Sequence, residues 1–138
     1  YAAIGAAVAA TWKFPPALIA SMAPLLSGVW NPPETPADAL HAYAHLANEL
    51  CERANLEECD PAVALDEIAL RFRGVYKGSP AMLAELLGAS LEKFRELAPT
   101  LGVDVAHNDF YRRATAFCAL AAEQAAAQAV TEESATAG

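Results

Sequence analysis

Two histidines four residues apart are the side chains best spaced for metal chemistry. His41 and His45 would share one face of a helix, because residues four apart are neighbours on a helix surface. Two imidazoles at this spacing can share a zinc or other transition-metal ion, and a helical imidazole can also ligate the metal of a tetrapyrrole such as chlorophyll. A third ligand is needed, and His107 is the only other histidine. The alternative is a solvated polar face opposite a buried stripe.

A basic segment, RFRGVYKG over residues 71–78, is the second candidate site. Arg71, Arg73 and Lys77 alternate with aromatic residues, a pattern that can hold an anionic or phosphorylated ligand. The alternative is structural, because basic residues complement the dipole at the end of a helix and Gly74 would end that helix. We favour the structural interpretation.

Motifs of nucleophilic and acid–base catalysis are missing from the sequence. It contains no GxSxG, no phosphate-binding loop and no HExxH. Cys51, Cys59 and Cys118 form no CxxC pair, which favours free thiols and an intracellular or organellar compartment, although a bridge between Cys51 and Cys59 stays open. We therefore expect a protein that is not an enzyme.

The charges of the chain are distributed unevenly. Residues 1–33 contain one charged side chain, Lys13, and five prolines, whereas residues 34–138 contain all 17 acidic residues and the remaining basic ones. The net charge of −8 argues against nucleic acid and against simple adsorption to anionic lipid. A segment this apolar must lie against the rest of the protein, another protein, a ligand or a lipid surface.

Residues 1–33 are therefore predicted to be an apolar docking segment. Two short helices are expected over residues 2–12 and 16–30, separated by a proline pair, with a kink at Pro24. Fifteen helical residues span about 22 Å, less than the roughly 30 Å hydrocarbon core of a bilayer, so no transmembrane span is expected. Because the chain begins with Tyr1 and not Met, a processed or truncated N-terminus is expected. The residues predicted to contact the partner are its large apolar ones: Trp12, Phe14, Leu18, Ile19, Leu25, Leu26 and Trp30.

The remainder of the chain carries the start signals of four helices. Thr35-Pro36, Asp60-Pro61 and Ser79-Pro80 each place an N-cap residue before a proline at the first helical position, and Asn108 caps a last helix. No stretch alternates with period two, so no strand is expected. The helices are expected over residues 36–55, 61–73, 80–97 and 109–130, within a domain spanning 34–130, with a polar tail over 131–138. In the first of them the buried stripe is expected to be Leu40, Tyr43, Ala47, Leu50 and Ala54.

These patterns predict an all-α protein: a bundle of about four amphipathic helices preceded by one or two short apolar, proline-interrupted helices. Over residues 32–125 the order of elements resembles a half-repeat of the peridinin–chlorophyll antenna proteins, through DALHAYAHLA at 38–47, the Asp-Pro start at 60 and the closing helix at 110–125. The resemblance implies an all-helical protein that wraps pigments. The adjacent His-His of that family is absent, since the comparable stretch here is Glu67–Leu70.

The function predicted first is that of a non-catalytic subunit or interaction domain of a larger assembly, docked through residues 1–33. Its expected partners are other protein subunits, and a membrane surface is the other surface against which residues 1–33 could be buried. No cofactor is expected. The second hypothesis is an antenna-like protein that binds a pigment such as chlorophyll, a lipid or another tetrapyrrole. The third is a metal-dependent enzyme that uses His41 and His45.

Overall fold

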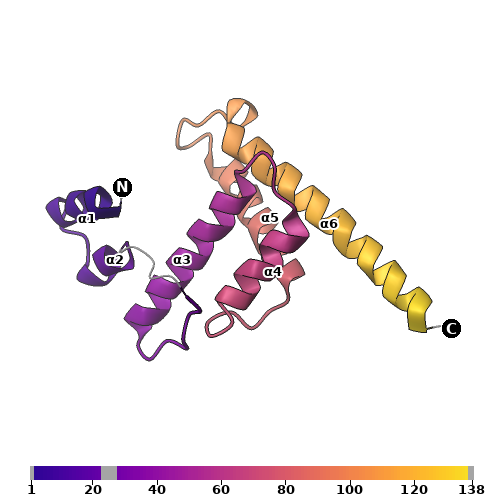
Figure 1. Ribbon diagram of the computed structural model, residues 1–138. Coiled ribbons are helices and arrows are strands. Elements are labelled where there is room, and N and C mark those ends of the chain that lie inside the picture. The colour runs from indigo at the N-terminus through magenta and orange to yellow at the C-terminus, as the bar shows by residue number, and fades with distance from the viewer. Residues whose placement is uncertain (1, 23–27, 137–138) are drawn as a thin grey trace. The chain divides into compact units, whose positions relative to one another are not determined.

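The computed structural model describes residues 2–22 and 28–136 and is built of helices (Figure 1). No strand occurs in these residues. The prediction of an all-α bundle, with four longer helices after two short apolar ones, is confirmed. The elements are α1 (Ala2–Thr11), α2 (Pro16–Ser21), α3 (Pro36–Ala54), α4 (Pro61–Arg71), α5 (Pro80–Leu97), a 3-10 turn η1 (Val105–His107) and α6 (Asp109–Thr136).

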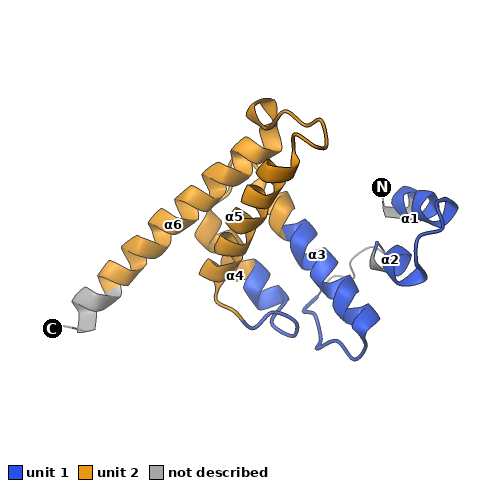
Figure 2. Cartoon of the chain, turned by 180° about the vertical axis from the view of Figure 1, so that it is seen from behind, with its two compact units in different colours: residues 1–49, 68–77 blue, residues 50–67, 78–138 orange. Residues whose placement is uncertain are grey.

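The chain divides into two compact units (Figure 2). Unit 1 comprises residues 1–49 and 68–77, which contain α1, α2, most of α3 and the end of α4. Unit 2 comprises residues 50–67 and 78–138, which contain the end of α3, most of α4, and α5 and α6. Helices α3 and α4 therefore each contribute to both units.

The predicted helix starts are confirmed by their capping hydrogen bonds. At α3 the Thr35 hydroxyl accepts from the Asp38 N–H at 3.1 Å, and the Asp38 carboxylate accepts in return from the Thr35 N–H at 3.0 Å. This reciprocal pair is a capping box, which satisfies backbone donors that have no partner inside the helix. Asp60 accepts from the Ala62 N–H at the start of α4, and Asn108 accepts from the Tyr111 N–H at the start of α6.

Unit 2 has its core between α5 and α6, which pack along each other (Figure 1). Leu83, Leu87 and Leu91 of α5 recur every four residues and are buried, as expected of one helix face. Two of the buried residues of α6 are alanines, and small side chains allow two helix axes to approach closely. The buried residues of α6 are Ala114, Phe117 and Ala121.

The buried face of α3 differs from the predicted one. Leu40 and Tyr43 were expected inside, but they are 42% and 52% exposed, and Ala47 is exposed as well. His45 and Glu49 are buried instead, at 6% and 8% exposure. Both stripes fit a helical period of 3.6 residues, so periodicity alone could not choose between them. The prediction was right for Leu50 and Ala54, near the end of α3.

Two helices have ends that the sequence misplaced. Helix α2 ends at Ser21, and residues 28–30 are not helical, so the helix expected over 16–30 is shorter than predicted. The kink expected at Pro24 lies outside the described residues. Helix α6 continues to Thr136, past the expected end near residue 130, and no glycine or proline interrupts it. Within the described residues, no helix has the length and apolar character that crossing a membrane requires.

Candidate docking segment and its anchor

Helix α1 presents a stripe of large apolar side chains to solvent. Ile4 and Val8 of α1 and Trp12, which directly follows its last residue, recur at four-residue intervals. The Trp12 N–H still donates to Val8 O, so the three side chains lie on one face. Their exposures are 68%, 41% and 68%, whereas Ala9 is only 2% exposed. Helix α1 carries no charged residue, and its other residues are almost all alanine. A helix without a polar face is normally buried on all sides. The exposed stripe of α1 is therefore a surface that another molecule would be expected to cover.

The corner between α1 and α2 holds two of the predicted contact residues. Lys13 adopts a left-handed conformation (φ 57°), the Lys13 N–H donates to Ala10 O, and the Phe14 N–H donates to Ala9 O, both at 3.0 Å. These two bonds form a Schellman motif, which satisfies the last carbonyls of α1 and reverses the chain before Pro15. The Trp12 and Phe14 rings meet edge to face with centroids 6.0 Å apart. The corner therefore exposes an aromatic pair of fixed geometry.

The other predicted contact residues fall into three groups. Leu18 and Ile19 of α2 are half-buried. Leu25 and Leu26 lie outside the described residues. Trp30 is half-buried and, unlike Trp12, has its ring within a cluster of this chain's own side chains.

Trp30 anchors the end of the docking segment to unit 1. Its backbone N–H donates to the carbonyl oxygen of Arg71 at 2.9 Å. Its indole stacks on the buried ring of Phe72, with centroids 5.8 Å apart and planes inclined by 14°. Aromatic pairs at this separation add about 0.5–1.5 kcal/mol to the burial of their area. The end of the segment is thus held by a backbone hydrogen bond and by ring stacking.

Gly74 makes the close approach of this segment possible. A Cβ atom at residue 74 would meet the Trp30 carbonyl oxygen, and would lie 2.8 Å from the Asn31 carbonyl carbon and 2.9 Å from the Pro32 nitrogen. All three neighbours are backbone atoms, which cannot move aside as a flexible side chain would. Glycine is required here because the backbone of residues 30–32 occupies the space of a side chain.

The predicted histidine pair lies under the same indole. The Trp30 ring centroid is 5.3 Å from that of His41 and 5.6 Å from that of His45, and the two imidazoles are 4.6 Å apart. The expected solvated face is therefore wrong for His45, which is buried. The Nε2 atom of His41 and the Nε1 atom of Trp30 are buried and make no hydrogen bond within the described part of the chain.

The third histidine, His107, forms no metal-binding group with His41 and His45 among the described residues. His107 belongs to η1 in unit 2, where its Nδ1 lies 2.7 Å from Asp104 and its side chain is 86% exposed. Among the described residues, no group of three or more histidine, cysteine, aspartate or glutamate side chains is placed to hold a metal ion. All three cysteines are free thiols, so Cys51 and Cys59 are not bridged.

The basic segment at the end of α4 is engaged within unit 1. The Arg71 guanidinium forms an ion pair with the buried Glu49 carboxylate, with an N–O distance of 3.0 Å. The Lys77 ammonium donates to the carbonyl oxygen of Arg73 at 2.7 Å, close to the end of α4. Arg71 and Lys77 are therefore both engaged with other groups of unit 1. Arg73 itself is exposed.

Sequence reasoning missed the residues that receive Trp30. Gly74 was interpreted only as a helix stop, and no contact of Trp30 with Phe72 was predicted. A usable signal was present, since Glu49 lies four residues after His45 and eight after His41, which marks a continuous stripe on α3.

No protein-family model, characterised protein or solved structure matches this chain.

Proposed function

We propose that this protein is a non-catalytic subunit or interaction domain of a larger assembly, docked through its apolar N-terminal segment. The observation that carries the proposal is the exposed stripe formed by Ile4 and Val8 of the uncharged helix α1 and by Trp12 directly after it. Burial of one large apolar side chain contributes about 1.5–3 kcal/mol. Three such residues on one short helix therefore supply a substantial driving force for association.

The proposed contact surface continues from the α1 stripe to the corner that follows it. Trp12 and Phe14 present a fixed aromatic pair, and aromatic residues of this kind supply most of the energy in protein interfaces. Leu18 and Ile19 extend the surface along α2, while Trp30 is the internal anchor that ties the segment to the helical domain. A folded protein subunit is the proposed partner, since the net charge of −8 disfavours anionic surfaces.

The test uses the full chain in size-exclusion chromatography with light scattering. We expect the wild type to form assemblies that a mild non-ionic detergent disperses, because detergent covers the apolar stripe in place of a partner. A variant carrying Ile4→Glu and Trp12→Glu is expected to be monomeric without detergent. The control is Leu101→Glu in unit 2, where an apolar side chain of similar exposure (65%) lies outside the segment.

A wild-type chain that stays monomeric at high concentration and takes up no detergent would overturn the docking proposal. Equal effects of Leu101→Glu and of the double variant would also count against it, because isolated exposed apolar residues are common on protein surfaces.

A second candidate function, binding of an apolar ligand such as a tetrapyrrole, is favoured by His41. Its Nε2 is buried in aromatic surroundings without a hydrogen-bond partner in the described residues, as an axial ligand would be before metal coordination. A ligand at this position would have to replace the Trp30 indole. The absorption spectrum of protein purified from its native source tests this: a colourless preparation removes the tetrapyrrole candidate.

A further inference from the structure

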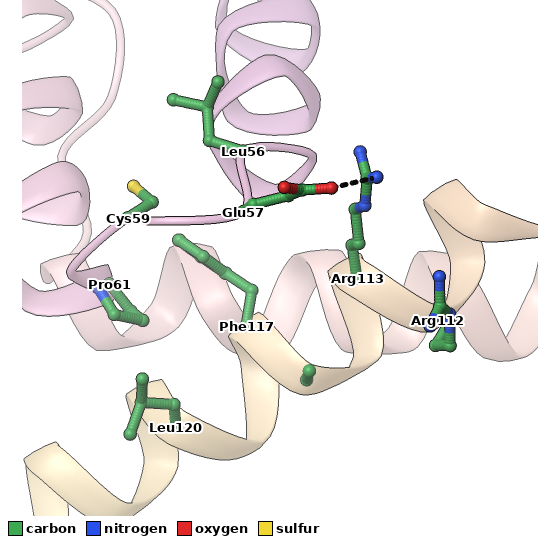
Figure 3. A pocket seen from close by; sticks show the side chains of 9 residues that line it. Leu56, Glu57, Cys59, Pro61, Arg112, Arg113, Phe117 and Leu120 are labelled. Atoms are coloured by element: carbon green, nitrogen blue, oxygen red, sulfur yellow. Dashed lines mark hydrogen bonds and ion pairs between the residues drawn. The ribbon is translucent and has the colours of Figure 1, made fainter.

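Unit 2 contains a pocket of about 360 Å³, formed by the loop between α3 and α4 and by the first half of α6 (Figure 3). Its volume is at the lower end of the range for small-molecule sites. None of its lining residues belongs to the docking segment, so the inference below is independent of the proposed function.

One part of the pocket is apolar. Phe117 and Pro61 are buried side chains in its lining, and both come from elements of unit 2. Leu56 and Leu120 also line it but remain 55% and 43% exposed. Large side chains that line a cavity and are still partly exposed leave apolar area that a ligand could remove from water.

The other part of the pocket carries two guanidinium groups, from Arg112 and Arg113 (Figure 3). Arg113 donates to the Glu57 carboxylate at 2.7 Å and to the Asn55 carbonyl oxygen at 3.2 Å. Arg112 donates to the Asp109 carboxylate at 2.7 Å. A guanidinium has five N–H donors, so these bonds leave donors on both arginines for a further acceptor.

The carboxylates paired with these two arginines can be replaced by another anion at little cost. The Glu57 and Asp109 side chains are 77% and 74% exposed, and exposed ion pairs contribute little free energy. A carboxylate brought by a ligand can therefore replace Glu57 on Arg113 at small cost. A planar carboxylate matches the fork of a guanidinium, which can donate two parallel hydrogen bonds to it.

We propose that this pocket binds a medium-chain carboxylate, such as a short fatty acid. The chain lies against Phe117, Leu56 and Leu120, and the carboxylate accepts hydrogen bonds from Arg112 and Arg113. The apolar part alone would take an alkane or an alcohol equally well. The arginine pair at one end is what selects an acid.

Cys59 is one of the residues that line the same pocket and its thiol is free, so its alkylation rate can report occupancy. Burial raises the pKa of the Cys51 and Cys118 thiols, which slows their reaction with electrophiles. The experiment measures the alkylation rate of each cysteine in the full chain by peptide mass spectrometry, with octanoate as the probe. We expect saturating octanoate to slow alkylation of Cys59 about fivefold or more and to leave the other two rates unchanged.

Matched probes and variants separate the two parts of the pocket. Octanol, which has the same chain without the acid, is expected to protect Cys59 at least several times less well. Arg112→Gln is expected to raise the octanoate concentration needed for half-protection, and this exposed side chain can be changed without disturbing the fold. Glu57→Gln removes the competing carboxylate and is expected to lower that concentration by roughly two- to fivefold.

Absence of protection by octanoate would overturn the proposal. Equal protection by octanol and octanoate would also overturn it, because the arginines would then select nothing. A half-protection concentration that is the same in wild type and in Arg112→Gln would remove the assigned role of that side chain.

Discussion

The backbone N–H of Trp30 and the carbonyl oxygen of Arg71 are joined by a hydrogen bond of 2.9 Å, which links the end of the N-terminal segment to the end of α4. The side chain of Arg71 reaches Glu49 on α3, so one residue contacts both the segment and the helix beside it. The anchor is therefore part of the internal structure of unit 1.

Gly74→Ala is expected to destabilise unit 1 by about 1–3 kcal/mol, because the new Cβ would collide with the backbone of residues 30–32. Urea unfolding followed by tryptophan fluorescence measures the change. The matched control is Gly88→Ala in the interior of α5, where a Cβ meets nothing within 4 Å. That variant is expected to gain about 0.5–1 kcal/mol from helix propensity. Equal effects of the two substitutions would show that residues 30–32 do not press on Gly74.

Arg71→Met is expected to destabilise the protein by roughly 2–3 kcal/mol, because it leaves the Glu49 carboxylate buried without its cation. The value lies below that of a fully buried pair because the Arg71 side chain is 32% exposed. The double variant Glu49→Gln/Arg71→Met should recover part of the loss, since no buried charge remains. A double-mutant cycle by chemical denaturation measures this coupling. Strict additivity of the two single changes would contradict it.

His41→Leu is expected to leave the free energy of unfolding unchanged or to raise it by up to about 1 kcal/mol. The substitution removes a buried nitrogen that has no hydrogen-bond partner in the described residues and retains an apolar side chain of similar size. Thermal and urea unfolding of the full chain provide the measurement. Marked destabilisation would indicate that the imidazole makes a stabilising polar interaction. Unchanged stability combined with loss of a bound chromophore would support the tetrapyrrole candidate.

The raised pKa values of the Cys51 and Cys118 thiols lead us to expect that the folded protein loses stability in alkaline solution. Burial raises their pKa, so they ionise at lower pH in the unfolded chain than in the folded protein. The unfolded state then binds fewer protons, and the free energy of unfolding should fall as the pH rises above about 8.5. Urea midpoints between pH 7.5 and 9.5 measure the slope. A Cys51→Ala/Cys118→Ala variant should show a smaller slope, and an identical slope would contradict this origin.

The sequence by itself determined the helices and the uneven distribution of apolar residues. Capping residues followed by proline, as in Thr35-Pro36, act through hydrogen bonds within a few residues, so they can be interpreted without tertiary information. The apolar character of α1 is likewise a property of composition.

Only the tertiary structure decided which face of α3 is buried and what holds the docking segment. Two stripes of α3 satisfy the helical period, and the choice depends on Trp30 and Phe72, which are distant from His45 in the sequence. The close approach at Gly74 and the pocket beside Arg113 likewise arise from segments far apart in the chain. Local hydrogen bonding fixes where a helix begins, whereas the side that it buries depends on which other surfaces reach it.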